Sequence, residues 1–178
     1  ALTLAAGGSN RHLDTMEPDH TNKPSLQRGA ALFTNYCMGC HSLEYARYKR
    51  IAEDLEIPDE LYEENLIFTG AKIGELIKIG MDKDAAADWF GSAPPDLTLV
   101  SRVRGEDWLY SYFRAFYKDD SRPLGVNNAV FSNVGMPHVL VDMQGLCAVP
   151  PKIGTNASVD PLSGNVRGTD ICDEWAIE

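Results

Sequence analysis

The pentapeptide Cys37-Met38-Gly39-Cys40-His41 lies in the first quarter of this 178-residue chain. Two cysteines three positions apart, with a histidine directly after the second, form the attachment signature of a c-type haem. Each thiol adds across one vinyl group of the porphyrin, so both sulfurs face the same edge of the ring. The histidine that follows then lies beneath the iron. The motif therefore predicts one covalent haem c, attached through Cys37 and Cys40, with His41 as an axial ligand.

A Cys-x-x-Cys pair also occurs as a thioredoxin-like redox pair and as half of a zinc site. The redox pair does not need His41, and the surrounding sequence is not an obvious βαβ unit. A zinc site needs two further ligands at regular spacing. The remaining cysteines, Cys147 and Cys172, lie far along the chain and are not spaced in that way. The sequence therefore favours haem attachment over both alternatives.

A sixth iron ligand has to come from a distant loop that folds over the opposite face of the ring. The segment Gly135-Met136-Pro137-His138 fits this requirement, because Pro137 stiffens the loop and biases Met136 towards an extended conformation. We predict Met136 as this ligand, and His138 remains the rival that would give bis-histidine ligation. A thioether ligand raises the reduction potential relative to a second imidazole.

The segment Pro94-Pro95-Asp96-Leu97 is rigid, since proline fixes φ and disfavours helix in the residue before it. Such an extended segment can lie along a flat ring, so Pro95 is a candidate haem contact. Arg102 and Arg104 follow shortly after, and arginine binds carboxylates through two parallel hydrogen bonds. One of the two is expected to bind a haem propionate.

Cys147 and Cys172 are the two cysteines left after haem attachment. In an oxidising compartment an even remainder suggests a disulfide between them. The chain begins at Ala1 rather than at methionine, as expected after removal of a signal peptide. Covalent haem attachment in bacteria also takes place outside the cytoplasm.

The formal net charge of the chain is −10, which excludes nucleic acid as an expected partner because phosphate binding needs a basic face. The charge instead favours a basic protein partner. Residues 51–64 contain seven acidic residues and no Lys or Arg. This acidic run is equally consistent with a docking surface and with solvated helix faces. No run of about 18 apolar residues occurs, so the sequence contains no predicted membrane span.

The length predicts one domain of mainly α structure with long irregular loops. Residues 1–23 are expected to form an N-terminal arm, and residues 24–178 the haem domain. Ser25 is the expected N-cap of the first helix and Asp84 that of a later one. Trp89 is large enough to form a wall of the porphyrin site, but it is expected in the core. Apolar spacing predicts helices over residues 25–36, 43–55, 59–66, 72–80, 84–90 and 105–118, followed by loop over residues 145–178.

Four segments together resemble the cytochrome c1 family, the haem subunits of quinol–cytochrome c oxidoreductase (the cytochrome bc1 complex). They are RGAALFTNYCMGCHSL at residues 28–43, APPDL at 93–97, RVRGEDW at 102–108 and NVGMP at 133–137. The attachment motif is common to all c-type cytochromes, and the other segments are the specific part. The likeness spans residues 24–146 and is closest to the proteobacterial branch.

This resemblance implies a class I cytochrome c-like fold around one covalent haem, with His41 and Met136 as axial ligands. It also implies that Arg104 is the arginine near a propionate. The family's further C-terminal helix and membrane anchor are not visible in this sequence, so they are expected beyond Glu178.

The resemblance further implies a subunit of an oxidoreductase complex that is itself a redox carrier without substrate chemistry. Its haem would take an electron from the Rieske iron–sulfur protein and pass it to a periplasmic cytochrome c, soluble or membrane-tethered. Cytochrome b would be the neighbouring subunit, at the periplasmic face of the bacterial inner membrane. The alternative is a free-standing soluble c-type cytochrome.

Overall fold

The computed structural model describes residues 13–154, 158–159, 166–167 and 171–177, so the first 12 residues of the predicted arm lie outside it. The chain divides into two compact units. Residues 18–104 form the motif unit, and residues up to 17 together with those from 105 onward form the methionine unit. Each unit has its own apolar core. The predicted division into an arm and a haem domain stays a prediction.

The motif unit begins with a helix that leads directly into the cysteine motif. The side chain of Asn22 caps this helix by accepting the Ser25 amide at 3.1 Å. The prediction of Ser25 as the N-cap is therefore wrong. The elements of this unit are α1 (Lys23–Leu32), the π-helix η1 (Phe33–Cys37), β1 (Leu43–Arg47), α2 (Tyr48–Asp54), α3 (Asp59–Leu66), β2 (Leu76–Ile77), α4 (Lys83–Phe90) and α5 (Val100–Arg104).

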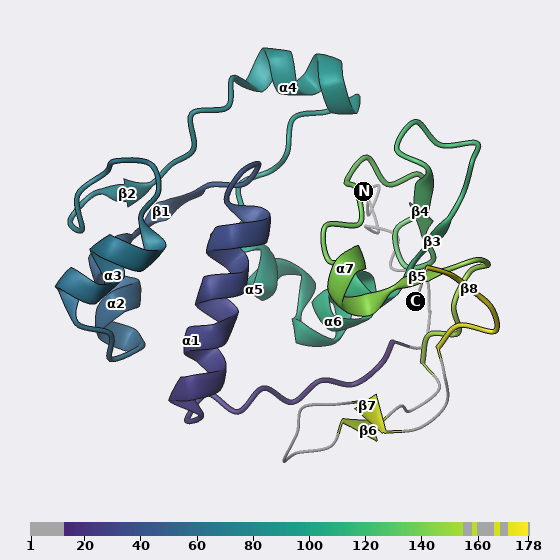
Figure 1. Cartoon of the computed structure of the whole chain (residues 1–178), viewed down its shortest axis with the longest axis horizontal. Helices are drawn as coiled ribbons and strands as arrows, with labels where there is room; N and C mark the ends of the chain where they lie inside the picture. The colour runs from purple at the N-terminus through teal and green to yellow at the C-terminus, as the bar shows by residue number, and fades with distance from the viewer. Residues whose placement is uncertain (1–12, 155–157, 160–165, 168–170, 178) are drawn as a thin grey trace, which may run out of the picture. The chain divides into compact units, whose positions relative to one another are not determined.

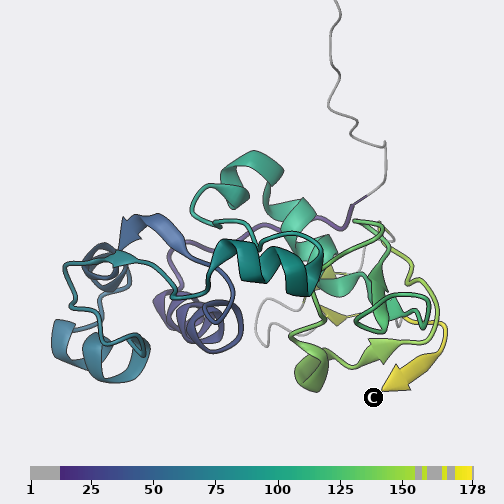
Figure 2. The same ribbon diagram turned by 90° about the horizontal axis from the view of Figure 1, so that it is seen from above.

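The core of the motif unit lies where α2, α3 and the strand pair β1–β2 meet (Figure 2). Tyr48 and Tyr62 are almost fully buried and pack edge to face, with ring centroids 6.3 Å apart. Met38, from within the cysteine motif, belongs to the same buried cluster. The turn that bears both thiols is therefore anchored in this core through the residue between them.

The helix predicted over residues 43–55 holds only from Tyr48 to Asp54, and the helix predicted over residues 72–80 is wrong. Residues 43–47 form β1, and the chain becomes helical only at Tyr48; β1 pairs antiparallel with β2. That strand β2 lies within residues 72–80, where a helix was also predicted. In both segments the backbone hydrogen bonds run between neighbouring strands instead of along a helix. The predicted helix over residues 84–90 is present as α4, but its N-cap is Asp82, which accepts the Ala85 amide at 2.9 Å.

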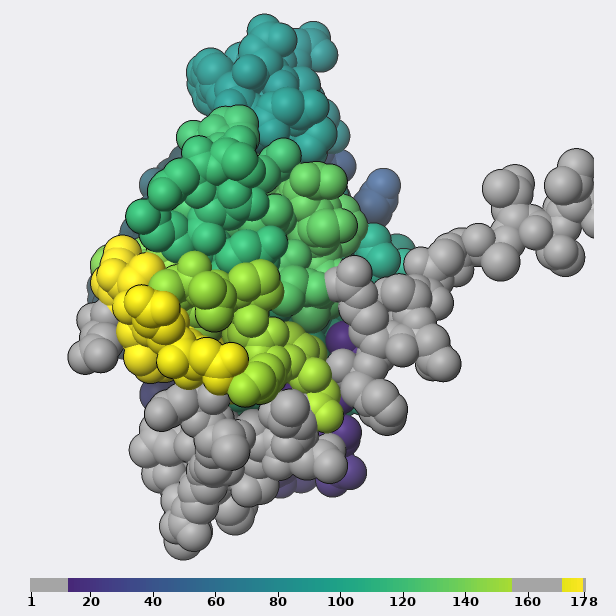
Figure 3. Space-filling model, turned by 90° about the vertical axis from the view of Figure 1, so that its right-hand side faces the viewer, coloured from purple at the N-terminus to yellow at the C-terminus, as the bar shows by residue number. Residues whose placement is uncertain are grey.

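The methionine unit contains the amphipathic helix α6, the short helix α7, a mixed sheet ordered β4-β3-β5-β8 (Figure 1) and a separate strand pair, β6–β7. Strand β3 pairs antiparallel with β4 and parallel with β5, and β8 pairs antiparallel with β5. The C-terminal residues that include β8 (yellow) lie against the yellow-green residues that include β5 (Figure 3). Its elements are α6 (Glu106–Arg114), β3 (Phe116–Lys118), β4 (Val126–Asn128), α7 (Val141–Gln144), β5 (Leu146–Cys147), β6 (Ser158–Val159), β7 (Val166–Arg167) and β8 (Trp175–Ile177).

The expectation of mainly α structure therefore holds only in part, because short strands contribute to both units. The helix predicted over residues 105–118 ends at Arg114, and its last residues form β3. The region from residue 145 onward, predicted as loop, contains β5 and β8. A disulfide joins Cys147 at the end of β5 to Cys172, with 5.2 Å between their Cα atoms, as the cysteine count predicts.

A buried ion pair fixes the N-terminal segment to the methionine unit. The Asp14 carboxylate is 1% exposed and accepts hydrogen bonds from Arg114 Nη1 at 2.8 Å and from the Gly154 amide at 2.9 Å. The Asp14 amide donates to Ser111 Oγ at 2.8 Å. Residues 13–17 are thus part of a folded unit. No helix in the described part of the chain is both long and apolar enough to span a membrane.

Candidate functional site

The cysteine motif is a tight turn at the end of the π-helix. The Cys37 carbonyl accepts the amides of both Cys40, at 3.0 Å, and His41, at 2.9 Å. Cys37 and Cys40 are free thiols, each partly exposed. Burial raises the pKa of the Cys37 thiol, and the neighbouring Cys40 raises it further, so Cys37 stays protonated at neutral pH. Neither sulfur forms a disulfide within the described part of the chain.

The His41 ring is held in one orientation by a backbone carbonyl. The side chain is 9% exposed, and its Nδ1 lies 2.8 Å from the Pro95 carbonyl oxygen. A carbonyl only accepts hydrogen bonds, so Nδ1 carries the proton and Nε2 keeps its lone pair. This is the arrangement in which histidines bind metals, with one nitrogen donating to a carbonyl or carboxylate and the other bound to the metal.

Asp96 holds the Pro95 segment against the chain that follows the motif. Its Oδ2 accepts the Glu44 amide at 2.6 Å, and its Oδ1 accepts the Thr98 amide at 3.0 Å. Burial alone would raise the pKa of this carboxyl, but the hydrogen bonds from Glu44 and Thr98 outweigh it and lower the pKa. Ser42 adds to the attachment, because its carbonyl accepts the Leu97 amide at 3.0 Å. These contacts keep the Pro95 carbonyl within reach of His41.

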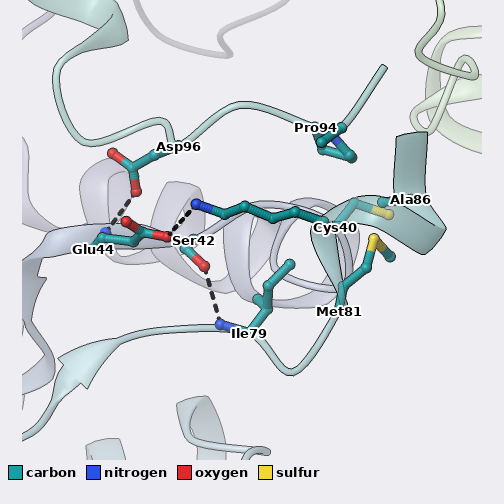
Figure 4. A pocket seen from close by; sticks show the side chains of 10 residues that line it. Cys40, Ser42, Glu44, Ile79, Met81, Ala86, Pro94 and Asp96 are labelled. Atoms are coloured by element: carbon teal, nitrogen blue, oxygen red, sulfur yellow. Dashed lines mark hydrogen bonds and ion pairs between the residues drawn. The ribbon is translucent and has the colours of Figure 1, made fainter. Parts of the chain in front are cut away.

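A cavity of about 50 Å³ lies beside Cys40 (Figure 4). The sulfurs of Cys40 and Met81 lie at one end with Ala86 and Pro94, whereas the other end carries an ion pair between Glu44 and a lysine of α4 at 3.3 Å. The cavity is too small to hold a porphyrin. Apolar groups line the end of the cavity where the Cys40 thiol lies.

Met136 lies in the methionine unit and packs against its core. The Tyr112 hydroxyl donates a hydrogen bond to Met136 Sδ at 3.3 Å. Burial raises the pKa of Tyr112 to about 12, so this hydroxyl remains a donor at every physiological pH. A thioether sulfur has two lone pairs. The hydrogen bond occupies one of them and leaves the other available to a metal.

His138, the rival ligand, is already engaged. Its Nε2 lies 3.0 Å from the Gly145 carbonyl, and its ring stacks on Phe116 with centroids 4.7 Å apart and planes inclined by 8°. Burial lowers the pKa of His138, so the neutral ring donates this hydrogen bond from Nε2. Iron ligation through Nε2 would require His138 to give up the Gly145 contact. The choice of Met136 over His138 as the sixth ligand stays a prediction.

The other predicted haem contacts are on the surface of the motif unit. Arg102 and Arg104 lie in the last turn of α5, and both side chains are exposed. Trp89 is 65% exposed, so its predicted place in the core is wrong. Trp89 packs only against the edge of Phe90 among the described aromatic rings, with centroids 6.4 Å apart.

The acidic run spans α2 and α3, and ion pairs neutralise part of it. Lys49 contacts Glu53 at 3.8 Å and Asp59 at 2.6 Å, and Asp54 pairs with an arginine one turn earlier. Glu60, Glu63 and Glu64 are exposed on α3 and make no ion pair with any described residue, although Glu63 accepts the Ile73 amide at 3.1 Å. The negative surface therefore centres on α3 rather than on the whole run.

Sequence reasoning missed the groups that position the candidate ligands. The Asp96 side chain and the Tyr112 hydroxyl each act on a residue that is distant in sequence, at 52 and 24 positions respectively. The only available signal for Tyr112 was its place in the apolar stripe of the predicted helix, which indicates burial but not a partner. Within the described residues, no three His, Cys, Asp or Glu side chains gather as a metal site would require.

Comparison with known proteins matches residues 15–72 to the cytochrome c1 family. Cytochrome c1 of Allochromatium vinosum is 54% identical over 142 residues, which are 80% of this chain and 58% of that protein. The ammonia monooxygenase gamma subunit of Nitrosomonas europaea is 41% identical over 156 residues, which are 88% of this chain and 66% of that protein. A mitochondrial cytochrome c1 heme protein of Neurospora crassa is 27% identical over 167 residues, covering 80% and 49%.

The chain thus spans between about half and two thirds of the length of these relatives. Two free thiols on one turn lie directly before a buried histidine whose Nδ1 contacts a carbonyl, as the attachment signature of a c-type haem predicts. The matched residues include this motif. The chain belongs to the cytochrome c1 family.

Proposed function

We propose that this chain is the electron-transfer haem subunit of a membrane-bound quinol–cytochrome c reductase, the cytochrome bc1 complex. The observation that carries the proposal is the His41 ring, whose Nδ1 is held by the Pro95 carbonyl directly after two free thiols. A redox pair or a structural thiol pair gives no reason to bury and orient this histidine. The donor set therefore fits a covalently attached haem.

Cys37 and Cys40 would hold one haem c covalently, and His41 Nε2 and Met136 Sδ would be its two axial ligands. Pro95 would lie along the ring, and Arg104 would bind a propionate. Such a haem supplies one-electron redox chemistry at its iron. The chain's own groups set the conditions for it: the Pro95 carbonyl orients His41, and the Tyr112 hydroxyl withdraws electron density from the Met136 sulfur.

The electron would come from the Rieske iron–sulfur protein and pass to a periplasmic cytochrome c, soluble or membrane-tethered. Cytochrome b would be the neighbouring subunit, and the site of action would be the periplasmic face of the bacterial inner membrane. Family membership supports this assignment. The unpaired carboxylates of Glu60 and Glu64 support a basic electron acceptor, because exposed charge mainly steers association between partners.

Affinity purification of the tagged natural protein from detergent-solubilised membranes tests the proposal. We expect a dihaem cytochrome b and an iron–sulfur subunit to co-purify with it in equal amounts. Recovery as a single haem protein in the periplasmic fraction would instead establish the free-standing carrier. Co-purification with the other subunits of an ammonia monooxygenase would assign it to the complex named for its Nitrosomonas europaea relative.

A further inference from the structure

Two buried asparagines, Asn127 and Asn128, lie side by side in β4, within the methionine unit. They are 8% and 1% exposed. Buried polar side chains are costly unless each polar group finds a partner, and those that do find partners often fix a local structure. Neither residue belongs to the proposed ligand set. Their partners show what they hold in place.

The Asn128 side chain links α6 to the loop that leads to Met136. Its Nδ2 donates to the Tyr112 carbonyl at 2.8 Å, and its Oδ1 accepts the amides of Val130 and Phe131 at 2.9 and 3.0 Å. Tyr112 is also the residue whose hydroxyl donates to Met136 Sδ. One side chain thus fixes both the start of the Met136 loop and the residue that contacts the Met136 sulfur.

Asn127 closes the same loop from its other end. Its Oδ1 accepts the Asn133 amide at 2.9 Å, and its Nδ2 donates to Asp119 Oδ2 at 2.9 Å. Asn133 has a φ of +60°, a conformation that few residues other than glycine adopt, so this hydrogen bond stabilises an unusual turn. The turn lies three residues before Met136.

Arg122 completes the attachment from the surface. Its Nη2 donates to the carbonyls of Asn133 at 3.1 Å and Val134 at 3.4 Å, directly before Gly135 and Met136. Residues 129–134 are thus fastened at both ends by side chains from outside the segment. Val134 is buried in the core of this unit, and Val130 and Met136 pack against that core, so the three side chains add polar attachments to an apolar one.

We propose that Asn127, Asn128 and Arg122 are positioning residues that keep the Met136 loop closed and the Tyr112 hydroxyl on the methionine sulfur. The proposal rests on the proposed function, in which Met136 is an axial ligand. It predicts that loosening this network lets an external ligand replace Met136 more often. Thiols and histidine of the cysteine motif are not involved.

The test uses the purified ferric holoprotein and the rate at which added imidazole binds to the haem. In Asn128→Asp, one oxygen still accepts the Val130 and Phe131 amides, but the second oxygen faces the Tyr112 carbonyl in place of a donor. The closed loop then leaves the buried Tyr112 carbonyl without a donor, which should raise the population of the open loop about tenfold. We therefore expect imidazole to bind about tenfold faster, and the amides of residues 130–133 to exchange faster with deuterium.

Asn65→Asp is the matched control, because Asn65 is exposed on α3 and donates only to a carbonyl of its own helix. Arg122→Lys is the second variant: it keeps the charge, loses the two-carbonyl contact, and lies near the surface, where misfolding is less of a concern. It should also speed imidazole binding.

In Tyr112→Phe, the effect of Asn128→Asp should shrink, since coupled groups act less than additively. A purely structural role would give independent effects.

If Asn128→Asp and Arg122→Lys both match Asn65→Asp in imidazole binding and deuterium exchange, the positioning role is refuted. If Asn128→Asp does not fold with haem, Arg122→Lys decides alone: a match between Arg122→Lys and Asn65→Asp in both measurements also refutes the positioning role. Met136→Ala separates this from the proposed function. If that variant binds imidazole no faster than the natural protein, Met136 is not the ligand, and the positioning role falls with it.

Discussion

Asp96 gives the most direct test of how this fold orients the axial histidine. Its two oxygens accept the amides of Glu44 and Thr98, at 2.6 and 3.0 Å, and so hold the Pro95 carbonyl on His41. Replacing Asp96 by alanine removes both hydrogen bonds, whereas Asp96→Asn removes only one, because its NH₂ group cannot accept.

Hydrogen bonds to a charged group contribute about 1.5–3 kcal/mol each, and partial exposure puts these two at the lower end of that range. We expect Asp96→Ala to lower the free energy of unfolding by about 3 kcal/mol and Asp96→Asn by about half as much. Loss of the Pro95 contact should also free the His41 ring, which lowers its basicity as a ligand and therefore shifts the haem reduction potential.

The pKa of Asp96 is lowered in the folded protein, so its contribution to stability is fully present above the unfolded-state value of about 3.9. That contribution is lost as the pH falls through the lowered pKa. Urea unfolding of the holoprotein, followed by circular dichroism between pH 3 and 7, measures the free energy of unfolding and its dependence on pH. The reasoning is refuted if Asp96→Asn is as stable as the natural protein at pH 7. It is also refuted if the stability of Asp96→Asn falls as steeply with decreasing pH as that of the natural protein.

Two further predictions concern other parts of the chain. Replacing both Cys147 and Cys172 by serine should lower the unfolding free energy by about 3.5 kcal/mol, because the disulfide closes a loop of some 25 residues; a reductant should lower the natural protein to the same level and leave the variant unchanged. Glu60→Gln with Glu64→Gln should slow reduction of a basic cytochrome c and flatten its dependence on salt, whereas Asp54→Asn, at a carboxylate already paired with arginine, should do so far less. Equal rates in all three proteins would leave α3 as ordinary surface.

The sequence predicted best where local chemistry decides the structure. The helices around residues 59–66 and 84–90 and the Cys147–Cys172 disulfide follow from spacing and residue count, whereas both predicted N-caps, Ser25 and Asp84, were wrong. The choice of Met136 over His138 rests on loop chemistry and stays a prediction.

The sequence failed where distant segments decide the structure. Residues 43–47 have apolar spacing compatible with a helix, but their backbone pairs with Leu76–Ile77 some 30 positions away. The buried pair of Asp14 and Arg114 joins residues 100 positions apart, and composition had indicated a solvated arm. Neither partner carries a local signal, since each is an ordinary charged residue until the fold brings the other to it.

The central claim is that one haem is bound by His41 and Met136. The oxidised holoprotein should show the weak long-wavelength absorption band that arises from a bond between methionine sulfur and ferric iron. That band should vanish in Met136→Ala and survive in His138→Ala, because the proposed ligand is Met136, whereas the His138 ring contacts the Gly145 carbonyl. A band that survives in Met136→Ala but disappears in His138→Ala would contradict the claim.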